Sequence, residues 1–213
     1  MRKAWILIVF LISTVAARAE PVTIAALGDS LTQGYGLVEE QGFVPQLQRW
    51  LDGQGAEVRL INAGVSGDTT AGGAARVAWT LTPDVDAMIV ALGGNDLLRG
   101  IDPAVSRANI ETILQEAQAQ GVDVLLIGME APGNYGVEYK AAFDAIYPEL
   151  SQAYGTLYLD SFFAGFGEAA QDPAQLRGVM QSDGIHPNAT GVAQIVEAIG
   201  PKVLDLIARS GSS

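Results

Sequence analysis

The sequence has 213 residues, a length typical of one globular domain, and 49% of them are hydrophobic, which is enough to bury a sizeable core. Acidic residues outnumber basic ones by 24 to 12, so the formal charge is −12 at pH 7, which disfavours binding to nucleic acid and to anionic membrane surfaces. The chain has no cysteine and one histidine. This composition excludes disulfides and a thiol nucleophile, and it leaves few ligands for a transition metal.

The N-terminus is predicted to be a secretory signal peptide. A basic pair at residues 2–3 precedes an apolar run at 5–12 that is too short to span a bilayer, and 17–19 read Ala-Arg-Ala, a typical cleavage signal. We interpret residues 1–19 as the signal and the protein as periplasmic or secreted; the alternative is an uncleaved membrane anchor. Cleavage would leave nine basic residues against 24 acidic ones, a formal charge of −15.

Strands and helices are predicted to alternate along the rest of the chain. Largely apolar runs predict five strands, at 22–27, 58–61, 87–92, 122–127 and 156–159, and the run at 87–92 is continuously apolar, as in buried parallel sheets. Helical spacing and capping residues predict helices from Phe43 to Gly53, over 70–81, from Asp102 to Gly121, around 143–150 and after Asn188. Such alternation implies a parallel sheet with helices on both faces.

We therefore predict an α/β fold, a three-layer α/β/α sandwich of flavodoxin-like type with a five-stranded parallel sheet. The single domain should cover residues 20–209, and 210–213 should form a disordered tail. The chain lacks the G-x-S-x-G turn of the α/β-hydrolase fold. Residues 161–181 are predicted to be irregular, and we interpret the three phenylalanines between 162 and 166 as core packing in preference to a lipid-contacting lid.

A candidate nucleophile, Ser30, follows the first predicted strand. Open α/β sheets place their sites at the carboxyl ends of the strands, so its hydroxyl can point into a cleft there. His186 is the only imidazole in the chain, and Asp183 lies three residues before it, close enough for a short turn to bring the carboxylate to the ring. These are the three groups of an acyl-transfer triad. The alternatives are a Gly-Asp-Ser turn that only caps a helix and a structural histidine.

Two glycine-rich turns, at 62–70 and 93–96, follow the second and third predicted strands. Their glycines leave backbone N–H groups unshielded, and Asn95 adds a side-chain amide. Both turns therefore fit as donors to an oxyanion. A plain tight turn and an Asx turn are the simpler explanations of the two segments.

Four segments, 28–36, 62–70, 93–96 and 182–187, together resemble the four sequence blocks of the SGNH, or GDSL, hydrolase family, in order and at similar spacing over nearly all of the mature chain. Ser30, Gly67, Asn95 and His186 match the four residues that name the family. The resemblance implies that Ser30 attacks, that His186 transfers the proton and that Asp183 orients the imidazole. It also implies that the oxyanion is held by the N–H groups of Ser30 and Gly67 and by the Asn95 amide.

Segments 93–100 and 132–136 resemble the bacterial periplasmic subgroup of acyl-thioesterases, lysophospholipases and arylesterases. This implies a serine hydrolase that needs no cofactor or metal and cleaves aryl esters, short to medium acyl esters and thioesters, and lysophospholipids through an acyl-enzyme. We expect a shallow groove at the strand ends. Its expected wall consists of Leu97, Leu98, Pro132, Asn134 and Tyr135.

Two alternatives stay open from the sequence. A carbohydrate O-acetylesterase would use the same triad, and a non-catalytic binding module could occupy the same sheet. As partners we expect a small acyl ester or thioester, no nucleic acid and no stable membrane association after signal removal. The protein is expected to be a monomer.

The signal-peptide interpretation predicts that the mature protein begins at Glu20, because cleavage follows the small residue at position 19. N-terminal sequencing of the protein recovered from the periplasm or the medium measures this directly. An active, membrane-bound protein that retains Met1 would contradict the interpretation and favour the anchor.

Overall fold

The computed structural model describes residues 21–171 and 176–211. The predicted signal peptide and the last two residues of the predicted tail lie outside the described residues. Within them, no helix is both long enough and apolar enough to cross a membrane.

A five-stranded parallel sheet forms the centre of the molecule, as predicted. Its strands stand in the order β2-β1-β3-β4-β5, which is the strand order of flavodoxin-like folds. Their bounds are β1 Val22–Gly28, β2 Val58–Gly64, β3 Ala87–Ala91, β4 Asp123–Ile127 and β5 Leu157–Leu159. The direction of the strand order reverses between β1 and β3, where such sheets open a crevice at the carboxyl ends of the strands.

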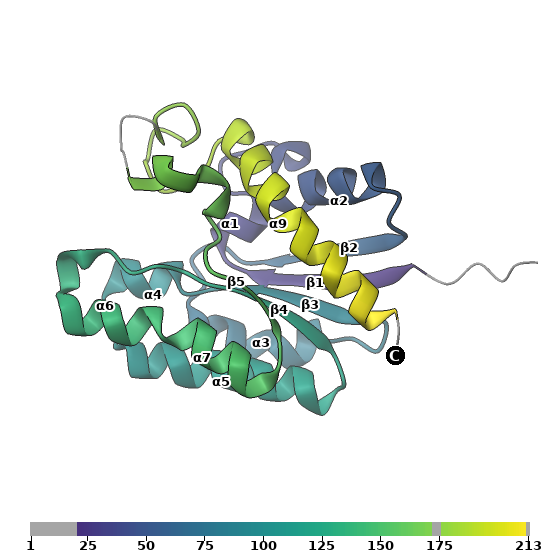
Figure 1. Ribbon diagram of the computed structural model, residues 1–213, viewed down its shortest axis with the longest axis horizontal. Helices are drawn as coiled ribbons and strands as arrows, with labels where there is room; N and C mark the ends of the chain where they lie inside the picture. Colours follow the sequence, from purple (N-terminus) through teal and green to yellow (C-terminus); the bar gives the residue numbers. More distant parts are fainter. Residues whose placement is uncertain (1–20, 172–175, 212–213) are drawn as a thin grey trace, which may run out of the picture.

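Helices cover both faces of the sheet and complete the predicted three layers. Helices α2 and α9 pack on one face, and α3, α5, α6 and α7 lie on the other (Figure 1). The bounds of the α-helices are α1 Ser30–Gln33, α2 Phe43–Gly53, α3 Thr70–Thr80, α4 Gly94–Arg99, α5 Pro103–Ala119, α6 Val137–Asp144, α7 Ile146–Tyr154 and α9 Ala189–Ser210. Three short 3-10 helices are η1 Glu39–Gln41, η2 Gly133–Tyr135 and η3 Ala164–Gln171.

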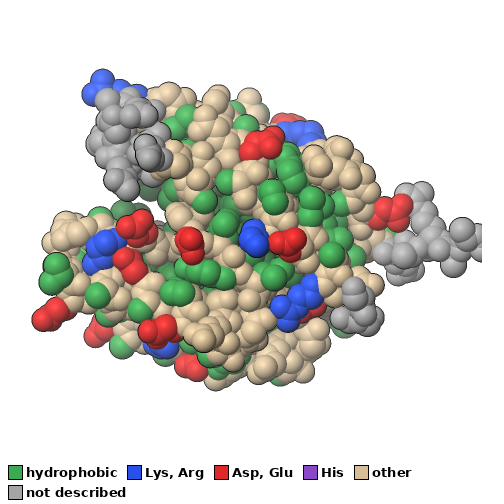
Figure 2. Space-filling model, in the orientation of Figure 1, with side chains coloured by type: hydrophobic (Ala, Val, Ile, Leu, Met, Phe, Trp, Pro, Cys, Tyr) green, Lys and Arg blue, Asp and Glu red, His purple; other side chains and the backbone are tan. Residues whose placement is uncertain are grey.

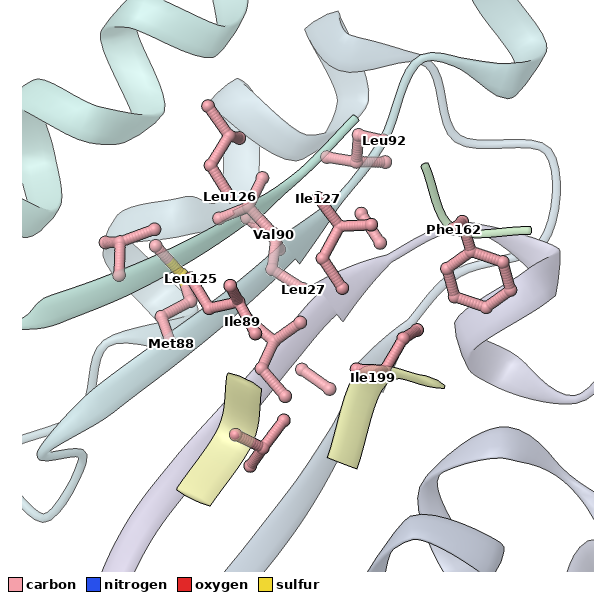
Figure 3. Packing of buried hydrophobic residues seen from close by; sticks show 14 of the residues in the cluster. Leu27, Met88, Ile89, Val90, Leu92, Leu125, Leu126, Ile127, Phe162 and Ile199 are labelled. Atoms are coloured by element: carbon pink, nitrogen blue, oxygen red, sulfur yellow. The ribbon is translucent and has the colours of Figure 1, made fainter. Parts of the chain in front are cut away.

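The core consists of the apolar strand residues and the helix side chains that face them. Figure 3 shows Leu27, Ile89 and Leu126 from three neighbouring strands, with Ile199 of α9 beside the sheet. All four are fully buried or nearly so. Because both faces are covered, the inner strands are apolar at almost every position, and this is why the sequence pattern located them.

Several predicted boundaries differ from the structure. Strand β2 continues three residues past its predicted end, because the edge strand pairs with β1 along its whole length even where its residues become polar or small. The helix predicted around 143–150 is two helices that meet at Ala145. Helix α9 includes Ser210, so the predicted tail begins too early. Residues 161–181 include η3 and are thus not wholly irregular.

Replacing Ile89 by alanine should lower the free energy of unfolding by about 2–5 kcal/mol, because the side chain is 1% exposed at the centre of β3 and its removal leaves a cavity. Val105→Ala is the matched control, since Val105 is 50% exposed on α5 and its loss should change stability by no more than about 0.5 kcal/mol. Urea denaturation of both variants measures the difference. Equal effects would contradict the assigned core.

Candidate active site

Ser30 is the first residue of α1 and follows directly on β1 through Asp29. The Asp29 carboxylate caps this helix, because its Oδ1 accepts a hydrogen bond from the Leu31 N–H at 3.0 Å. The Gly-Asp-Ser turn is therefore a helix cap, as the simpler interpretation proposed. It also presents Ser30, which is 9% exposed, to a cavity at the carboxyl edge of the sheet.

His186 meets this serine from the far end of the chain. Its Nε2 lies 2.8 Å from Ser30 Oγ, and its Nδ1 lies 2.7 Å from Asp183 Oδ2. Since the carboxylate accepts the hydrogen on Nδ1, the lone pair of Nε2 faces the serine, and the Ser30 hydroxyl donates to it. The structure thus brings together the three residues predicted as a triad.

The Asp183 carboxylate is held by the turn that carries it. Gly184, with φ of 68°, reverses the chain there, and Asp183 Oδ1 accepts the backbone N–H groups of Ile185 and His186 at 2.9 and 3.0 Å. The hydrogen bond to the His186 side chain, followed by these two backbone bonds, lowers the pKa of Asp183 to about 2. Asp183 therefore stays ionised around neutral pH.

Two residues near the imidazole were missed by sequence reasoning. The Tyr35 ring lies against the His186 ring, with their centroids 4.6 Å apart. The Gln181 side chain donates to the backbone carbonyls of Tyr35 and Pro187 at 2.8 and 3.0 Å and so ties the two loops together. Neither residue could be assigned a role from the sequence, because the contacts of Tyr35 with His186 and with Gln181 each join segments more than 140 residues apart.

The predicted oxyanion donors lie around the same cavity. Ser30, Gly67 and Asn95 all line it, and Gly67 has φ of 84°, a backbone conformation that favours glycine. Within the described residues, the backbone N–H groups of Ser30 and Gly67 have no hydrogen-bond acceptor. These two donors are therefore free to bind a ligand oxygen.

The Asn95 amide is not free in the same way. Its Nδ2 donates to the Asp68 carbonyl at 2.9 Å and to Asp29 Oδ2 at 3.2 Å, so both of its hydrogens have partners. The contact to Asp29 is the longer of the two. An oxyanion would have to replace this contact in order to bind Asn95.

Two buried carboxylates, Asp29 and Asp96, brace these donors. Asp96 is fully buried and accepts from the Thr70 N–H, the Thr70 hydroxyl and the Ser106 hydroxyl at 2.9, 2.6 and 2.9 Å. Asp29 is 1% exposed, and burial raises its pKa to about 6 although hydrogen bonds from Leu31 and Asn95 act in the opposite direction. The Asp96 carboxylate thus joins α4 to the start of α3 and to α5. The Asp29 carboxylate, with its raised pKa, lies beside Asn95.

A cavity of about 1110 Å³ surrounds Ser30, and Figure 2 shows the molecule hollowed beside α6. One wall contains every residue of the predicted substrate wall, namely Leu97, Leu98, Pro132, Asn134 and Tyr135. The opposite wall was not predicted; it includes Phe163, Phe166, Leu176, Met180 and Ile185. The expected shallow groove is therefore a larger, two-walled cavity. Phe162 and Phe166 are buried as predicted, but Phe163 and Phe166 also contact this space.

Among the described residues, no three His, Cys, Asp or Glu side chains come together in a way that could hold a metal ion. What the site offers is a serine hydroxyl, an oriented imidazole and free backbone donors beside apolar walls. This set of groups suits nucleophilic attack on a carbonyl carbon.

The raised pKa of Asp29 predicts a distinctive pH dependence of stability. The folded protein binds the proton of the Asp29 carboxyl group more tightly than the unfolded chain does. The contribution of Asp29 to the free energy of unfolding therefore falls as the pH rises from about 4 to about 6. Relative to Asp29→Asn, the wild type should lose on the order of 3 kcal/mol over this range. Urea denaturation of both proteins at several pH values measures the difference.

Asp183→Asn serves as the control of opposite sign. The pKa of Asp183 is lowered, so its contribution is complete above about pH 4 and is lost as the pH falls towards 2. Parallel stability curves for the wild type and Asp29→Asn between pH 4 and 7 would contradict the assignment to Asp29.

Curated relatives resemble this chain over most of its length. Esterase TesA of Pseudomonas aeruginosa is 37% identical over 191 residues, which cover 89% of this chain and 92% of that protein. Thioesterase 1/protease 1/lysophospholipase L1 of Escherichia coli K12 is 33% identical over 200 residues, which cover 93% of this chain and 91% of that protein.

Solved structures and a family model agree with these relatives. The crystal structure of TesA superposes with a TM-score of 0.77 at 37% identity, covering 86% of this chain and 99% of that one. AlinE4, an SGNH-hydrolase family esterase, gives 0.72 at 40% identity, covering 89% and 98%. The model of the GDSL-like lipase/acylhydrolase family matches residues 26–194. The resemblance found in the sequence is thereby confirmed, and the chain belongs to the GDSL-like lipase/acylhydrolase family, the SGNH hydrolases.

Proposed function

We propose that this protein hydrolyses carboxylic esters and thioesters through an acyl-enzyme on Ser30. The observation that carries the proposal is the continuous hydrogen-bonded chain from Ser30 Oγ through the imidazole to Asp183, with links of 2.8 and 2.7 Å. A binding module has no need of such a chain in a cavity, whereas acyl transfer requires it.

In the proposed mechanism, Ser30 Oγ attacks the carbonyl carbon while His186 Nε2 takes the hydroxyl proton. The Asp183 carboxylate holds the imidazole and stabilises its positive charge. The N–H groups of Ser30 and Gly67 bind the oxyanion, and the Asn95 amide joins them by exchanging its longer contact to Asp29 for the new charge. His186 then protonates the leaving alcohol or thiol, and water releases the acyl group by the same steps.

The proposed substrates are aryl esters and short to medium acyl esters and thioesters, with lysophospholipids as further candidates. Two features support this range. The relatives are described as an esterase, as a thioesterase and lysophospholipase, and as an arylesterase of Vibrio mimicus. Both cavity walls are rich in apolar side chains, which suits acyl and aryl groups better than the hydroxyl-rich surface of an acetylated sugar. An apolar site also discriminates weakly between chains that differ by one methylene.

We further propose that the enzyme works as a secreted or periplasmic monomer. Export is supported by the signal-like composition of residues 1–19. A monomer is supported by the site itself, since the proposed triad and all three oxyanion donors come from one chain.

Ser30→Ala and His186→Ala should each lower kcat by about a millionfold while the protein stays folded, because residues of a triad act as one unit. The measurement is hydrolysis of a short p-nitrophenyl ester, together with labelling of Ser30 by a fluorophosphonate. Ser66→Ala is the matched control: this serine also lines the cavity, but its hydroxyl bonds Gln33, and its loss should change kcat by less than about threefold. Near-wild-type turnover by His186→Ala would contradict the mechanism, since the chain has no second histidine.

The substrate range is tested on the wild type with two panels, one of p-nitrophenyl and thiol esters of increasing acyl length and one of acetylated sugars. We expect higher kcat/KM throughout the first panel. A clear preference for the acetylated sugars would replace the proposed substrate class with the carbohydrate O-acetylesterase alternative.

A further inference from the structure

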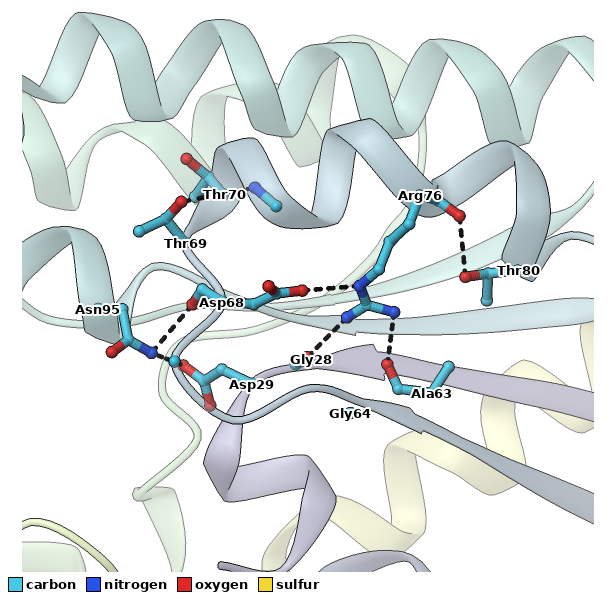
Figure 4. A network of polar contacts seen from close by, with 12 residues as sticks. Gly28, Asp29, Ala63, Gly64, Asp68, Thr69, Thr70, Arg76, Thr80 and Asn95 are labelled. Atoms are coloured by element: carbon cyan, nitrogen blue, oxygen red, sulfur yellow. Dashed lines mark hydrogen bonds and ion pairs between the residues drawn. The ribbon is translucent and has the colours of Figure 1, made fainter.

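Arg76, on α3, binds three different segments of backbone behind the proposed oxyanion hole. Its Nε donates to Asp68 Oδ2 at 2.7 Å, and its two terminal nitrogens donate to the carbonyls of Ala63 and Gly28 at 2.7 and 2.8 Å (Figure 4). The Arg76 side chain is only 23% exposed. Neither Arg76 nor Asp68 is among the residues that line the cavity, so Arg76 has no contact with a substrate there.

Each of the three acceptors lies within four residues of a proposed catalytic group in the chain. Gly28 ends β1, two residues before Ser30, and Ala63 lies near the end of β2, four residues before Gly67. Asp68 is the neighbour of Gly67, and its backbone carbonyl accepts the shorter hydrogen bond of Asn95, at 2.9 Å. One guanidinium therefore connects the supports of the nucleophile and of all three oxyanion donors.

The chemistry of arginine explains why this position needs a guanidinium. Three acceptors in different directions require a rigid, planar group with several N–H donors and a permanent charge. A lysine ammonium has three donors on one atom and cannot span acceptors that belong to two strand ends and a side chain. The ion pair with Asp68 is also partly buried, at 23% and 19% exposure, so water screens it less than it would a surface pair.

We propose that Arg76 is a positioning residue for the oxyanion hole: it fixes the 65–69 turn against the ends of β1 and β2 and thereby sets the places of the Gly67 N–H and the Asn95 amide. This inference rests on the proposed function and assigns a role to a residue outside the cavity. Donors of this kind act only when they are aimed at the charge that develops in the transition state. A small displacement of both should therefore slow the chemical step and leave substrate binding nearly unchanged.

The test begins with R76K, which keeps the positive charge and removes the planar fork. We expect kcat for a p-nitrophenyl ester to fall by about tenfold to a hundredfold, with KM within about twofold of wild type. R59K is the matched control, because Arg59 also pairs with an aspartate, Asp84 at 2.6 Å, but on the exposed surface. Its kcat should stay within about twofold of wild type.

A double-mutant comparison separates positioning from general stabilisation. If Arg76 acts through Asn95, R76K should cost much less when Asn95 is already alanine, by about threefold instead of tenfold or more. Thermal unfolding of all variants shows that each is folded at the assay temperature. R76A is the second variant, and R76K decides if R76A does not fold.

The inference is overturned if folded R76K keeps kcat within twofold of wild type, if only KM rises, or if R76K costs the same factor with and without Asn95. Failure of the proposed function would be seen in other measurements. It would appear as a wild type that hydrolyses no ester or thioester, or as a Ser30→Ala variant that retains activity.

Discussion

The pairing of β1 with its two neighbours determines where the reactive groups of this protein can meet. In the sheet register, Gly28 at the end of β1 lies level with Gly64 on β2 and Ala91 on β3. Three parallel strands thus stop at one line, and the turns that follow them carry Ser30, Gly67 and Asn95. Because the strands are hydrogen-bonded along their length, the distances between these turns are fixed by the sheet and not by the loops themselves.

The imidazole does not come from one of these three strand ends, and a separate turn near the C-terminus holds it. His186 lies 156 residues after Ser30, in a turn closed by the bridge between Met180 and Pro187 and by the hydrogen bond from the Gln181 N–H to the His186 carbonyl, at 2.7 Å. Asp183 occupies the same turn, so one short segment holds both the imidazole and its carboxylate. The folding of α9 against the sheet brings that segment to the serine.

Two carboxylates near the imidazole have very different pKa values because their surroundings differ. Asp183 accepts three hydrogen bonds near the surface, and its pKa falls to about 2. Asp29 is enclosed by protein, and burial raises its pKa to about 6. One is a permanent anion that faces the imidazolium, and the other can take up a proton where a second negative charge would oppose the oxyanion. The same residue type therefore serves two purposes at one site.

The sequence by itself determined the strands, the helices and the main residues of the proposed site, because each of these depends on residues that are close together in the chain. Apolar runs and capping residues specify the strands and helices, and Ser30, Gly67, Asn95 and His186 occur in short recognisable segments. The second cavity wall, the Tyr35 ring against His186 and the three bonds of Arg76 left no such pattern. Only the tertiary structure decided them, because these contacts join residues eight or more positions apart in the chain. Periodicity and propensity describe only how a residue relates to its nearer neighbours.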